Sequence, residues 1–233
     1  MVAFAGADPI GVLIGAKRPS GTLIHKIAVH PDHRRQGHGR HLLASLGSKL
    51  AILGPPRIVA EVPEALTAAS ELFTASGYVE ELVLTDYVLE REQREARELA
   101  GRYVIPVTVD DLVANDLLGP PSASASARQA PVCWERSVET LTARKDEIAG
   151  LAVASDERIE AYLLYWQNGE IVSLRSYIED GGARLGHLLS RLGGGSFRFP
   201  KVHPEEISPQ LLDTLGFRAV GAHRLYAGTA RPA

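Results

Sequence analysis

The sequence predicts an α/β protein with mixed sheets, built as two related units in tandem. Short β-branched segments alternate with segments whose leucines recur at helical spacing, and this alternation is typical of α/β architecture. Proline and glycine stand where these segments begin and end. Two short patterns from the first half also recur, in the same order, in the second half. We therefore interpret the chain as two copies of one arrangement of strands and helices.

The first half predicts a run of strands interrupted by two helices. The first helix begins near Gly39, because leucines at 42, 43, 46 and 50 share one helical face. The second has proline at its start and glycine at its end, since it runs from Pro63 to Gly77. The expected strands are residues 1–4, 9–17, 21–30, 57–62 and 78–91. Residues 90–102 are charged on most faces, which is typical of a solvated connecting helix.

The second half predicts the same alternation. Residues 147–178 resemble three antiparallel strands, with turns at 155–158 and 167–170. The other expected strands are 103–109, 197–202 and 217–227, and the expected helices are 134–148, 183–192 and 208–216. Residues 120–131 are of low complexity and predict a loop. We expect a first unit at 1–91, a connecting helix at 92–103 and a second unit at 104–233.

Two alignments carry the tandem interpretation. His41-Leu42-Leu43-x-x-Leu46-Gly47 recurs as His187-Leu188-Leu189-x-x-Leu192-Gly193. Leu72-Phe73-x-x-x-Gly77-Tyr78 recurs as Leu211-Leu212-x-x-x-Gly216-Phe217. Both patterns keep their order along the chain, as expected for a duplicated unit.

The bulk composition excludes several classes of function. The net charge of −3 provides no basic field for nucleic acid. The single cysteine, Cys133, cannot form a disulfide within the chain, which fits a reducing cytoplasm. No stretch reaches the roughly 20 apolar residues of a membrane span, and the first residues show no signal peptide. We expect a cytoplasmic protein that binds neither nucleic acid nor membrane.

The segment IAVHPDHRRQGHGRHLL, residues 27–43, predicts an anion site. A strand ends at a proline turn, and a helix begins beside Gly37 and Gly39, where bare backbone N–H groups can approach a ligand. Three arginines in this segment add positive charge. The segment is neither a Rossmann fingerprint, because position 42 is Leu, nor a P-loop, because no G-K-[ST] occurs.

Arg34-x-x-Gly37-x-Gly39 resembles the R/Q-x-x-G-x-G/A signature of the GNAT superfamily of N-acetyltransferases. The strand, the helix and the segment LFTASGY follow in that family's order, so simple loop chemistry is the weaker explanation. The resemblance covers residues 9–90 and is faint over 104–228. It implies a GNAT-like fold that binds acetyl-CoA as co-substrate, with strand backbone against the pantetheine arm and loop amides around the pyrophosphate. The residues at those positions are Ile27, Ala28 and Val29 on the strand, and Arg34, Arg35, Gln36, Gly37, His38, Gly39 and Arg40 in the loop.

The second unit is expected to be degenerate. The helix alignment places Asp180 where Arg34 stands, Ala183 at Gly37 and Leu185 at Gly39. An anion has replaced a cation, and both glycines have gained side chains. We therefore expect one acetyl-CoA per chain, bound by the first unit.

The catalytic residues depart from the family's pattern. The family's usual general base is a Glu at the position of Leu23, and the usual thiolate acid is a Tyr at the position of Phe73. His25 is our candidate base, because the strand is similar to that of arylalkylamine N-acetyltransferases and an imidazole titrates near neutrality. A packed strand histidine is the alternative. Tyr78 or Tyr87 could replace the missing acid.

The expected function is transfer of an acetyl group to a primary amine that the sequence does not identify. The alternative is a non-catalytic acyl-CoA-binding or protein-interaction module, favoured by the missing Glu and Tyr. Five histidines fall between residues 25 and 41, but they span a strand end, a turn and a loop, so we expect no metal site. A homodimer is possible. The first unit is expected to lack its family's first strand and two helices.

Overall fold

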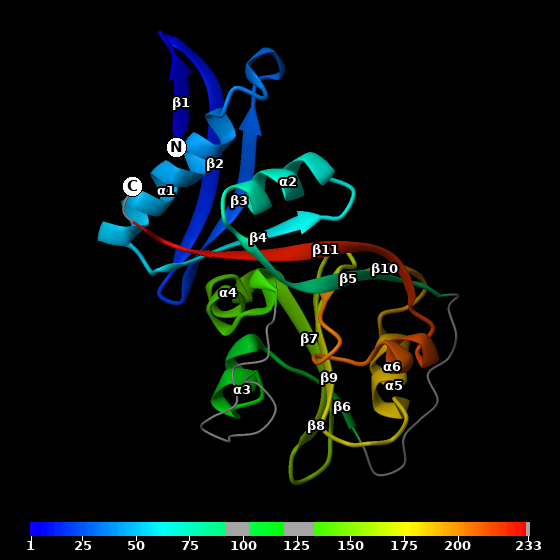
Figure 1. The fold of residues 1–233 in the computed structure, drawn as a ribbon. Helices are drawn as coiled ribbons and strands as arrows, with labels where there is room; N and C mark the ends of the chain where they lie inside the picture. Colours follow the sequence, from blue (N-terminus) through cyan, green and yellow to red (C-terminus); the bar gives the residue numbers. More distant parts are fainter. Residues whose placement is uncertain (92–102, 119–132, 232–233) are drawn as a thin grey trace. The chain divides into compact units, whose positions relative to one another are not determined.

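The computed structural model describes residues 1–91, 103–118 and 133–231 (Figure 1). Contacts divide the chain into two compact units: unit 1 is Met1–Val83 with Ala222–Ala233, and unit 2 is Leu84–Gly221. Both division points fall inside long strands, β5 (Val79–Arg91) and β11 (Arg218–Thr229). Each unit combines strands and helices, so the predicted α/β class is confirmed.

Unit 1 contains a mixed sheet in the order β1-β2-β3-β4-β11-β5, to which β5 and β11 contribute their unit 1 ends. Its elements are β1 (Val2–Ala5), β2 (Asp8–Arg18), β3 (Gly21–Val29), the 3-10 turn η1 (Pro31–His33), α1 (His38–Leu53), β4 (Arg57–Pro63) and α2 (Thr67–Ala75). β1 with β2, β2 with β3, and β4 with β11 are antiparallel, whereas β3 and β4 are parallel.

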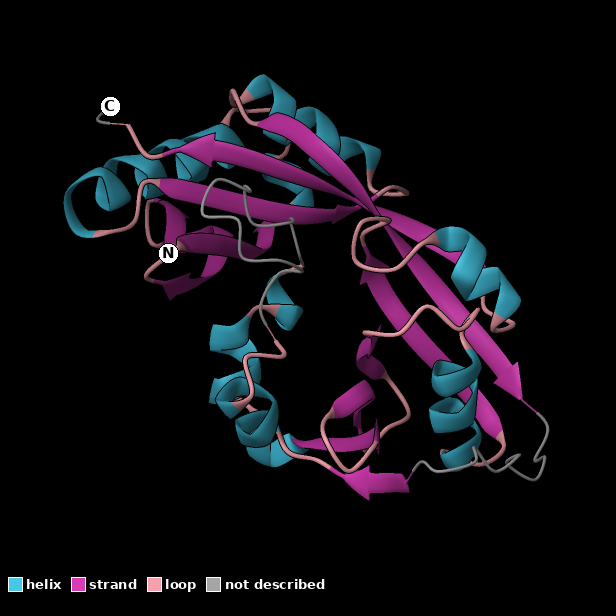
Figure 2. Cartoon of the chain, turned by 90° about the horizontal axis from the view of Figure 1, so that it is seen from below, coloured by secondary structure: helices cyan, strands magenta, loops and turns pink. Residues whose placement is uncertain are grey.

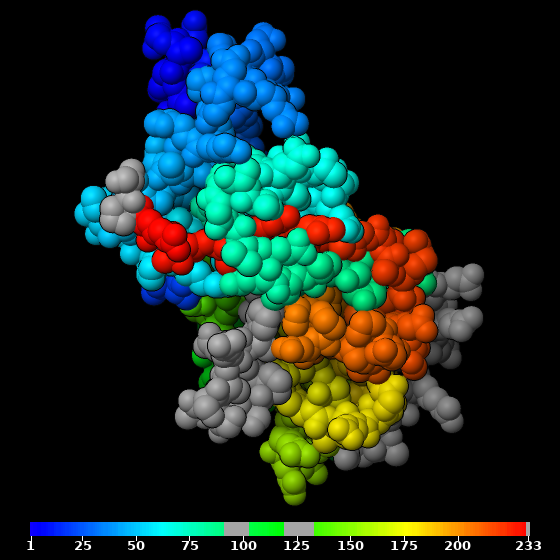
Figure 3. Space-filling view, viewed as in Figure 1, coloured from blue at the N-terminus to red at the C-terminus, as the bar shows by residue number. Residues whose placement is uncertain are grey.

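The core of unit 1 lies beneath α1 and α2. The four leucines that predicted α1 are buried, and they pack with Phe73 of α2 against strand residues such as Ile58 and Tyr226. Figure 3 shows the side chains of both helices covering the strands of unit 1 on the face turned to the reader. The helical spacing of the leucines therefore correctly predicted which face of α1 packs against the sheet.

Unit 2 contains a second sheet, four antiparallel strands in the order β6-β7-β8-β9 (Figure 2). Its strands are β6 (Tyr103–Pro106), β7 (Ile148–Ala154), β8 (Ile159–Trp166), β9 (Ile171–Ser176) and β10 (Gly195–Val202), the last paired antiparallel with β5. Its helices are α3 (Val109–Ala114), α4 (Val138–Ala143), α5 (Ala183–Arg191) and α6 (Pro209–Thr214), with 3-10 turns η2 (Trp134–Arg136) and η3 (Lys145–Glu147). No helix in the described ranges is long and apolar enough to cross a membrane.

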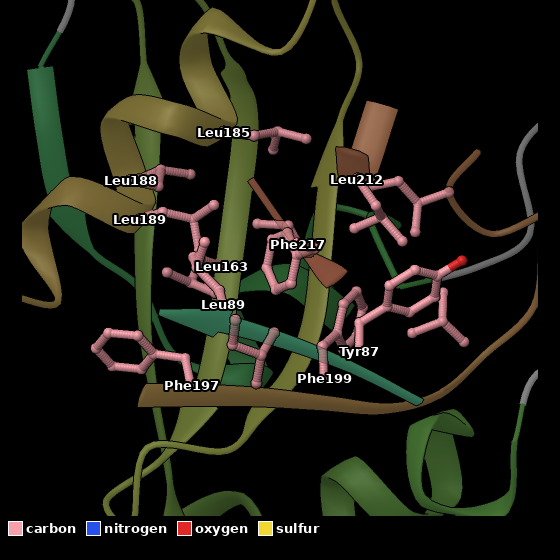
Figure 4. Close-up of a cluster of buried hydrophobic side chains, with 14 of the residues drawn as sticks. Tyr87, Leu89, Leu163, Leu185, Leu188, Leu189, Phe197, Phe199, Leu212 and Phe217 are labelled. Atoms are coloured by element: carbon pink, nitrogen blue, oxygen red, sulfur yellow. The ribbon is translucent and has the colours of Figure 1, made fainter. Parts of the chain in front are cut away.

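The main core of unit 2 forms beneath α5 and α6. Figure 4 shows the leucines of α5 pointing toward Leu163 of β8 and Phe199 of β10. Leu188, Leu189 and Phe199 have no exposed surface. A second cluster joins α3 and α4 to the other part of the sheet, around Leu112 and Leu164. Along the chain, β9, α5 and β10 follow one another in the same order of strand, helix and strand as β3, α1 and β4 of unit 1.

Two helices begin differently from the predictions. Pro63 ends β4, where it pairs with His223, and α2 begins only at Thr67. Proline fits there because it occupies the end of a strand. The predicted helix 134–148 is divided into η2, α4 and η3, since the Ser137 side chain accepts a hydrogen bond from the Thr140 amide and starts a new helix.

The compact units also differ from the boundaries that the sequence predicted. Residues 222–233 belong with unit 1, although 104–233 was expected to form the second unit. The reason is long-range pairing, because β11 runs along the whole of β4, from His223 opposite Pro63 to Thr229 opposite Arg57. The connecting helix was expected at 92–103 and the loop at 120–131. All of these residues except Tyr103 lie outside the described residues, and Tyr103 begins β6.

The backbone at the end of α2 repeats at the end of α6. The Tyr78 amide donates to the Phe73 carbonyl at 3.1 Å, and the Phe217 amide donates to the Leu212 carbonyl at 2.9 Å. The glycine before each is left-handed, with φ of 82° at Gly77 and 90° at Gly216. This arrangement is a Schellman-type helix end, which requires such a residue. The second predicted alignment therefore joins structurally equivalent residues.

Candidate functional site

β3 and β4 separate shortly after they begin. They pair in parallel at only two positions, Thr22 with Ile58 and Leu23 with Val59. Beyond Leu23, β3 remains paired with β2 on its other side as far as Val29. Among the described residues, the backbone edge of β3 that faces away from β2 therefore has no strand partner along Ile27, Ala28 and Val29, although the Val29 carbonyl accepts a hydrogen bond from the Arg34 side chain. Another extended molecule can pair with this edge.

The open edge leads into the loop before α1. Gly37 caps α1 in the left-handed conformation, with φ 87° and ψ −7°, and no side chain caps this helix. Arg35 also has a positive φ, 61°, which is uncommon for a residue with a side chain. Within the described residues no acceptor is seen for the backbone amides of residues 36–40. Such a run of amides at a helix N-terminus attracts anions.

The arginines of the loop make different contacts. Arg34 Nε donates to the Val29 carbonyl at 3.1 Å and so fixes the loop to the end of β3. Arg35 lies 3.5 Å from the Glu71 carboxylate of α2, and both side chains are largely exposed. Gln36 Nε2 donates to the Asp32 carbonyl. Among the described residues Arg40 has no ion-pair partner, so its charge is available to a ligand.

The two glycines of the signature, Gly37 and Gly39, are required for different structural reasons. A Cβ at Gly37 would meet nothing within 4 Å, so the space beside it is open. A Cβ at Gly39 would lie 3.1 Å from Leu72 Cδ2, on α2. Gly39 therefore permits α1 to pack against α2, whereas Gly37 provides the backbone conformation. The sequence had suggested ligand approach for both.

His25 lies at an irregularity of β3. Ile14 pairs with Lys26 and Gly15 with Ile24, so His25 is an extra residue on its strand, a β-bulge. It is exposed and makes no hydrogen bond with any described residue. In a regular strand His25 would share a face with Leu23, the family's usual position for the base, but the bulge interrupts this alternation. Bulges often re-aim a side chain beside an active site.

Phe73 is enclosed by two tyrosines of unit 1. Its ring stacks on Tyr226 at 5.7 Å and contacts Tyr78 edge to face at 5.3 Å. Burial raises the pKa of Tyr78 to about 12, so its phenol keeps its proton at neutral pH. Tyr78 thus retains the proton that a thiolate acid would need. Tyr87 belongs to the core of unit 2.

The matching helix of unit 2 is closed by its own carboxylate. Asp180 accepts hydrogen bonds from the Gly182 and Arg184 amides, both at 3.0 Å, and from the Arg184 guanidinium at 2.6 Å. Arg184 also donates to Glu160 at 2.8 Å. Burial works against ionisation of Asp180, but these hydrogen bonds outweigh it and hold its pKa below the ordinary value. An anion already occupies the amides that α1 leaves open.

The register predicted for this second loop is wrong by one residue. Gly182 caps α5 with φ 89° and ψ 11°, nearly the conformation of Gly37. Gly182 is therefore the counterpart of Gly37, although the alignment placed Ala183 there. The alignment followed leucine and histidine side chains, whereas a helix N-cap is defined by backbone conformation.

Unit 2 contains a pocket that no sequence pattern had indicated. It has a volume of about 1000 Å³ and lies beside the N-terminus of α5. Its lining includes Glu90, Asp180, Gly182, Ser196 and Gly216. The glycines of this region were visible in the sequence, but the pairing of β5 with β10 that brings Glu90 beside Ser196 was not.

Comparisons with known proteins agree with this geometry. Residues 1–80 match a family model described as an acetyltransferase (GNAT) domain. A search of curated proteins gives no match. A solved tandem GNAT protein from the clavulanic acid biosynthesis pathway is similar at a TM-score of 0.67 and 16% identity, covering 100% of this chain and 82% of its own. A GCN5-related N-acetyltransferase from Sphaerobacter thermophilus is similar at 0.65 and 14%, covering 98% of this chain and 79% of its own.

The repeated helix ends and the separated strands define a class of two-unit α/β proteins in which the N-terminus of α1 is open. Residues 1–80 form a GNAT domain, and the whole chain has the tandem GNAT fold. The match to the acetyltransferase (GNAT) family model thus lies in residues 1–80, and the fold of the whole chain is that of solved proteins with two GNAT units in tandem.

Proposed function

We propose that this protein is an N-acetyltransferase that binds acetyl-CoA in unit 1 and acetylates a primary amine. The observation that carries the proposal is the open edge of β3, which leads directly to the uncapped N-terminus of α1. An extended amide chain that ends in a pyrophosphate fits both features together. The pantetheine arm pairs with Ile27, Ala28 and Val29, and the pyrophosphate lies on the amides of residues 35–40.

The chemistry needs a neutral amine and a stable thiolate. In the proposal His25 accepts a proton from the acceptor ammonium, directly or through water. Its exposed position on the bulge leaves the imidazole open to a substrate. Tyr78 is the candidate that supplies a proton to the departing thiolate, because it belongs to unit 1, whereas Tyr87 lies in the core of unit 2. The amine acquires the acetyl group, and CoA leaves as the thiol.

One acetyl-CoA is expected per chain. The second helix N-terminus is occupied by Asp180, so phosphate oxygens would have to displace a partly buried ion pair with Arg184. Calorimetry should therefore give a stoichiometry of one. Two equivalent sites, or none, would contradict the proposal.

Gly37→Glu should abolish acetyl-CoA binding. The new side chain enters the open space beside the loop, adds negative charge and strains a left-handed backbone. Gly37→Asn is the matched control, because asparagine tolerates this conformation and is neutral. It should bind within about tenfold of the unchanged protein, a difference of about 1.4 kcal/mol. Equal loss in both variants would show that backbone strain alone is responsible.

The second candidate is a non-catalytic acyl-CoA-binding module. Phe73 favours this function, because its ring is buried in an aromatic cluster and has no acidic proton to donate to a departing thiolate. Thiol release from acetyl-CoA, followed with DTNB across a panel of amines, separates the two functions. Rapid release with at least one amine supports the transferase. Slow hydrolysis that no amine accelerates supports the binding module.

A further inference from the structure

The pocket of unit 2 is formed by four segments of the chain. The end of β5, the first turn of α5 with the residues before it, the start of β10 and the end of α6 contribute its lining. Pairing of β10 with β5 places Ser196 opposite Glu90 and so fixes two of these segments. The volume of about 1000 Å³ lies at the upper end of the range for small-molecule sites. The described lining residues all belong to unit 2, so this unit forms the pocket by itself.

Gly186 of α5 lines this pocket, and neither its backbone nor its packing explains a glycine. Its amide donates to the Gly182 carbonyl at 2.8 Å, as in a regular helix, and its φ is not left-handed. A Cβ on Gly186 would meet only Leu215 Cδ2, at 3.7 Å, among the described residues, which is ordinary contact. Glycine inside a helix is less stable than alanine. What the glycine provides is open space on the wall of the pocket.

The charge around the pocket is negative. Among its described lining residues Glu90 and Asp180 are carboxylates, and none is lysine, arginine or histidine. Asp180 and the buried Glu160 share the Arg184 guanidinium, at 2.6 and 2.8 Å, so these three side chains keep one net negative charge. Glu90 adds another. The pocket therefore repels phosphate groups and attracts cations.

Glu90 is the side chain that can pair with a ligand cation. Its Oε1 accepts a hydrogen bond from Ser196 Oγ at 2.9 Å, which orients the carboxylate. Among the described residues no donor is seen for its second oxygen, and the residue is exposed. An ammonium group has three donors and forms charge-assisted hydrogen bonds with a carboxylate. Beside it, a Cβ at Gly181 would meet nothing within 4 Å, so the wall there is uncovered backbone.

We propose that unit 2 binds a small organic cation in this pocket, with the ammonium group of the ligand paired with Glu90. The inference goes beyond acetyl transfer and does not depend on it. The N-terminus of α5 is closed to a pyrophosphate by Asp180, and the same region offers an open pocket of the opposite preference. The second unit is then a binding domain for a cation, and not only a degenerate copy of the first.

The test titrates the whole chain, without acetyl-CoA, with two primary amines and their neutral counterparts. The pairs are glucosamine with glucose, and putrescine with butanediol. At least one amine should bind about 10-fold more tightly than its counterpart at pH 7, because hydrogen bonds to a charged donor are stronger than neutral ones. In NMR spectra the bound amine should shift the backbone amides of Gly181, Gly186 and Gly216, which line the pocket.

Glu90→Gln isolates the charge. It keeps an oxygen that can accept from Ser196, so the fold should be retained, but the amine should bind about 10-fold more weakly. Glu157→Gln is the matched control, because Glu157 is an exposed carboxylate of unit 2 outside the pocket lining. Its amine affinity should equal that of the unchanged protein.

Gly186→Met isolates the space. Its side chain should extend into the pocket and weaken binding of the amine about 10-fold or more, while α5 becomes more stable, because methionine forms helices better than glycine. Gly186→Ala is the matched control. It adds only a Cβ at contact distance from Leu215, so α5 should also gain stability and the amine should still bind.

Three results would overturn the inference. Neither amine binding would exclude a cation site. Equal binding of the amines and their neutral counterparts would show that the pocket does not select charge. Unchanged affinity in Glu90→Gln, or amide shifts confined to other parts of the chain, would place the binding elsewhere. Acetyl-CoA calorimetry on the same samples tests the proposed function alone, so failure of acetyl-CoA to bind would leave this inference standing.

Discussion

At the scale of single residues, neighbouring positions of one signature serve different purposes. Gly37 provides a left-handed backbone beside open space, whereas Gly39 makes room for Leu72. Arg34 fixes the loop to Val29, and Arg40 has its charge available. A sequence pattern shows that such residues occur together, but only contacts show whether a ligand or the fold requires each one.

His25→Ala is the sharpest test at this scale. In our proposal His25 takes the proton from the acceptor, so its loss should lower kcat by about 10²-fold with little change in acetyl-CoA affinity. In the unchanged protein kcat should rise with pH as the general base loses its proton, because only neutral imidazole accepts a proton. This rise should be absent in the variant.

Lys26→Ala is the control for His25, because Lys26 is the next residue of β3 and is also exposed. It should leave kcat within about twofold and keep the pH dependence, since surface substitutions away from a site have small effects. Equal kcat in His25→Ala and the unchanged protein at saturating substrates would show that His25 takes no part in proton transfer.

At the scale of elements, the strands and helices followed from alternation and punctuation, but their ends and register did not. The leucines of α1 and the glycine after α2 were sufficient to place those helices. No sequence pattern indicated the bulge at His25, because a bulge depends on which residues of the opposite strand pair with it. The sequence alignment matched Gly37 with Ala183 and not with Gly182 for a similar reason, because backbone conformation, and not the side-chain pattern, defines a helix N-cap.

Asp180→Asn tests the closed helix of unit 2. The substitution keeps the shape but removes the charge that Arg184 and the first amides of α5 share, so α5 should lose about 1–2 kcal/mol of stability at pH 7. The pKa of Asp180 is lowered in the folded protein. Its stabilisation is therefore present above the unfolded value of about 3.9 and lost as the pH falls through the folded value.

Hydrogen exchange of the α5 amides measures this difference between the variant and the unchanged protein. The difference in α5 protection between the two proteins should be constant from pH 8 to about pH 5 and disappear in stronger acid, below the ordinary carboxyl pKa. Asp213→Asn, an exposed carboxylate on α6, is the control and should change little at either pH. A difference that persists at pH 3 would show that packing, and not charge, is responsible.

At the scale of the whole molecule, unit 1 is assembled from both ends of the chain. Residues 222–233 complete its sheet, and Tyr226 stacks on Phe73 in its core. The sequence predicted two consecutive units, because the pairing of β11 with β4 joins residues more than 150 positions apart along the chain and leaves no local signal. The tandem organisation itself was predictable from the two short alignments.

Deletion of residues 222–233 should therefore unfold unit 1 and leave unit 2 folded. β4 loses all of its paired partners in β11, and the aromatic cluster loses Tyr226. Hydrogen exchange should show lost protection at Arg57–Pro63 and retained protection in β7, β8 and β9. Deletion of residues 231–233 is the control and should preserve both, because it keeps β11 and Ala230, whose amide donates to the Pro56 carbonyl. Loss of protection throughout the chain would show that the units do not fold separately.

The division of unit 1 between the chain ends also sets an order of events during synthesis. Residues 84–221 of unit 2 are contiguous and emerge from the ribosome before residue 222. Nascent chains usually fold their N-terminal domains first. Here the opposite order is imposed, because β4 must wait for β11 while the translating ribosome completes the 159 residues between Pro63 and its partner His223. The nascent chain therefore carries an incomplete unit 1 and an unpaired β4 edge, the kind of exposed strand that chaperones protect, until β11 has been synthesised.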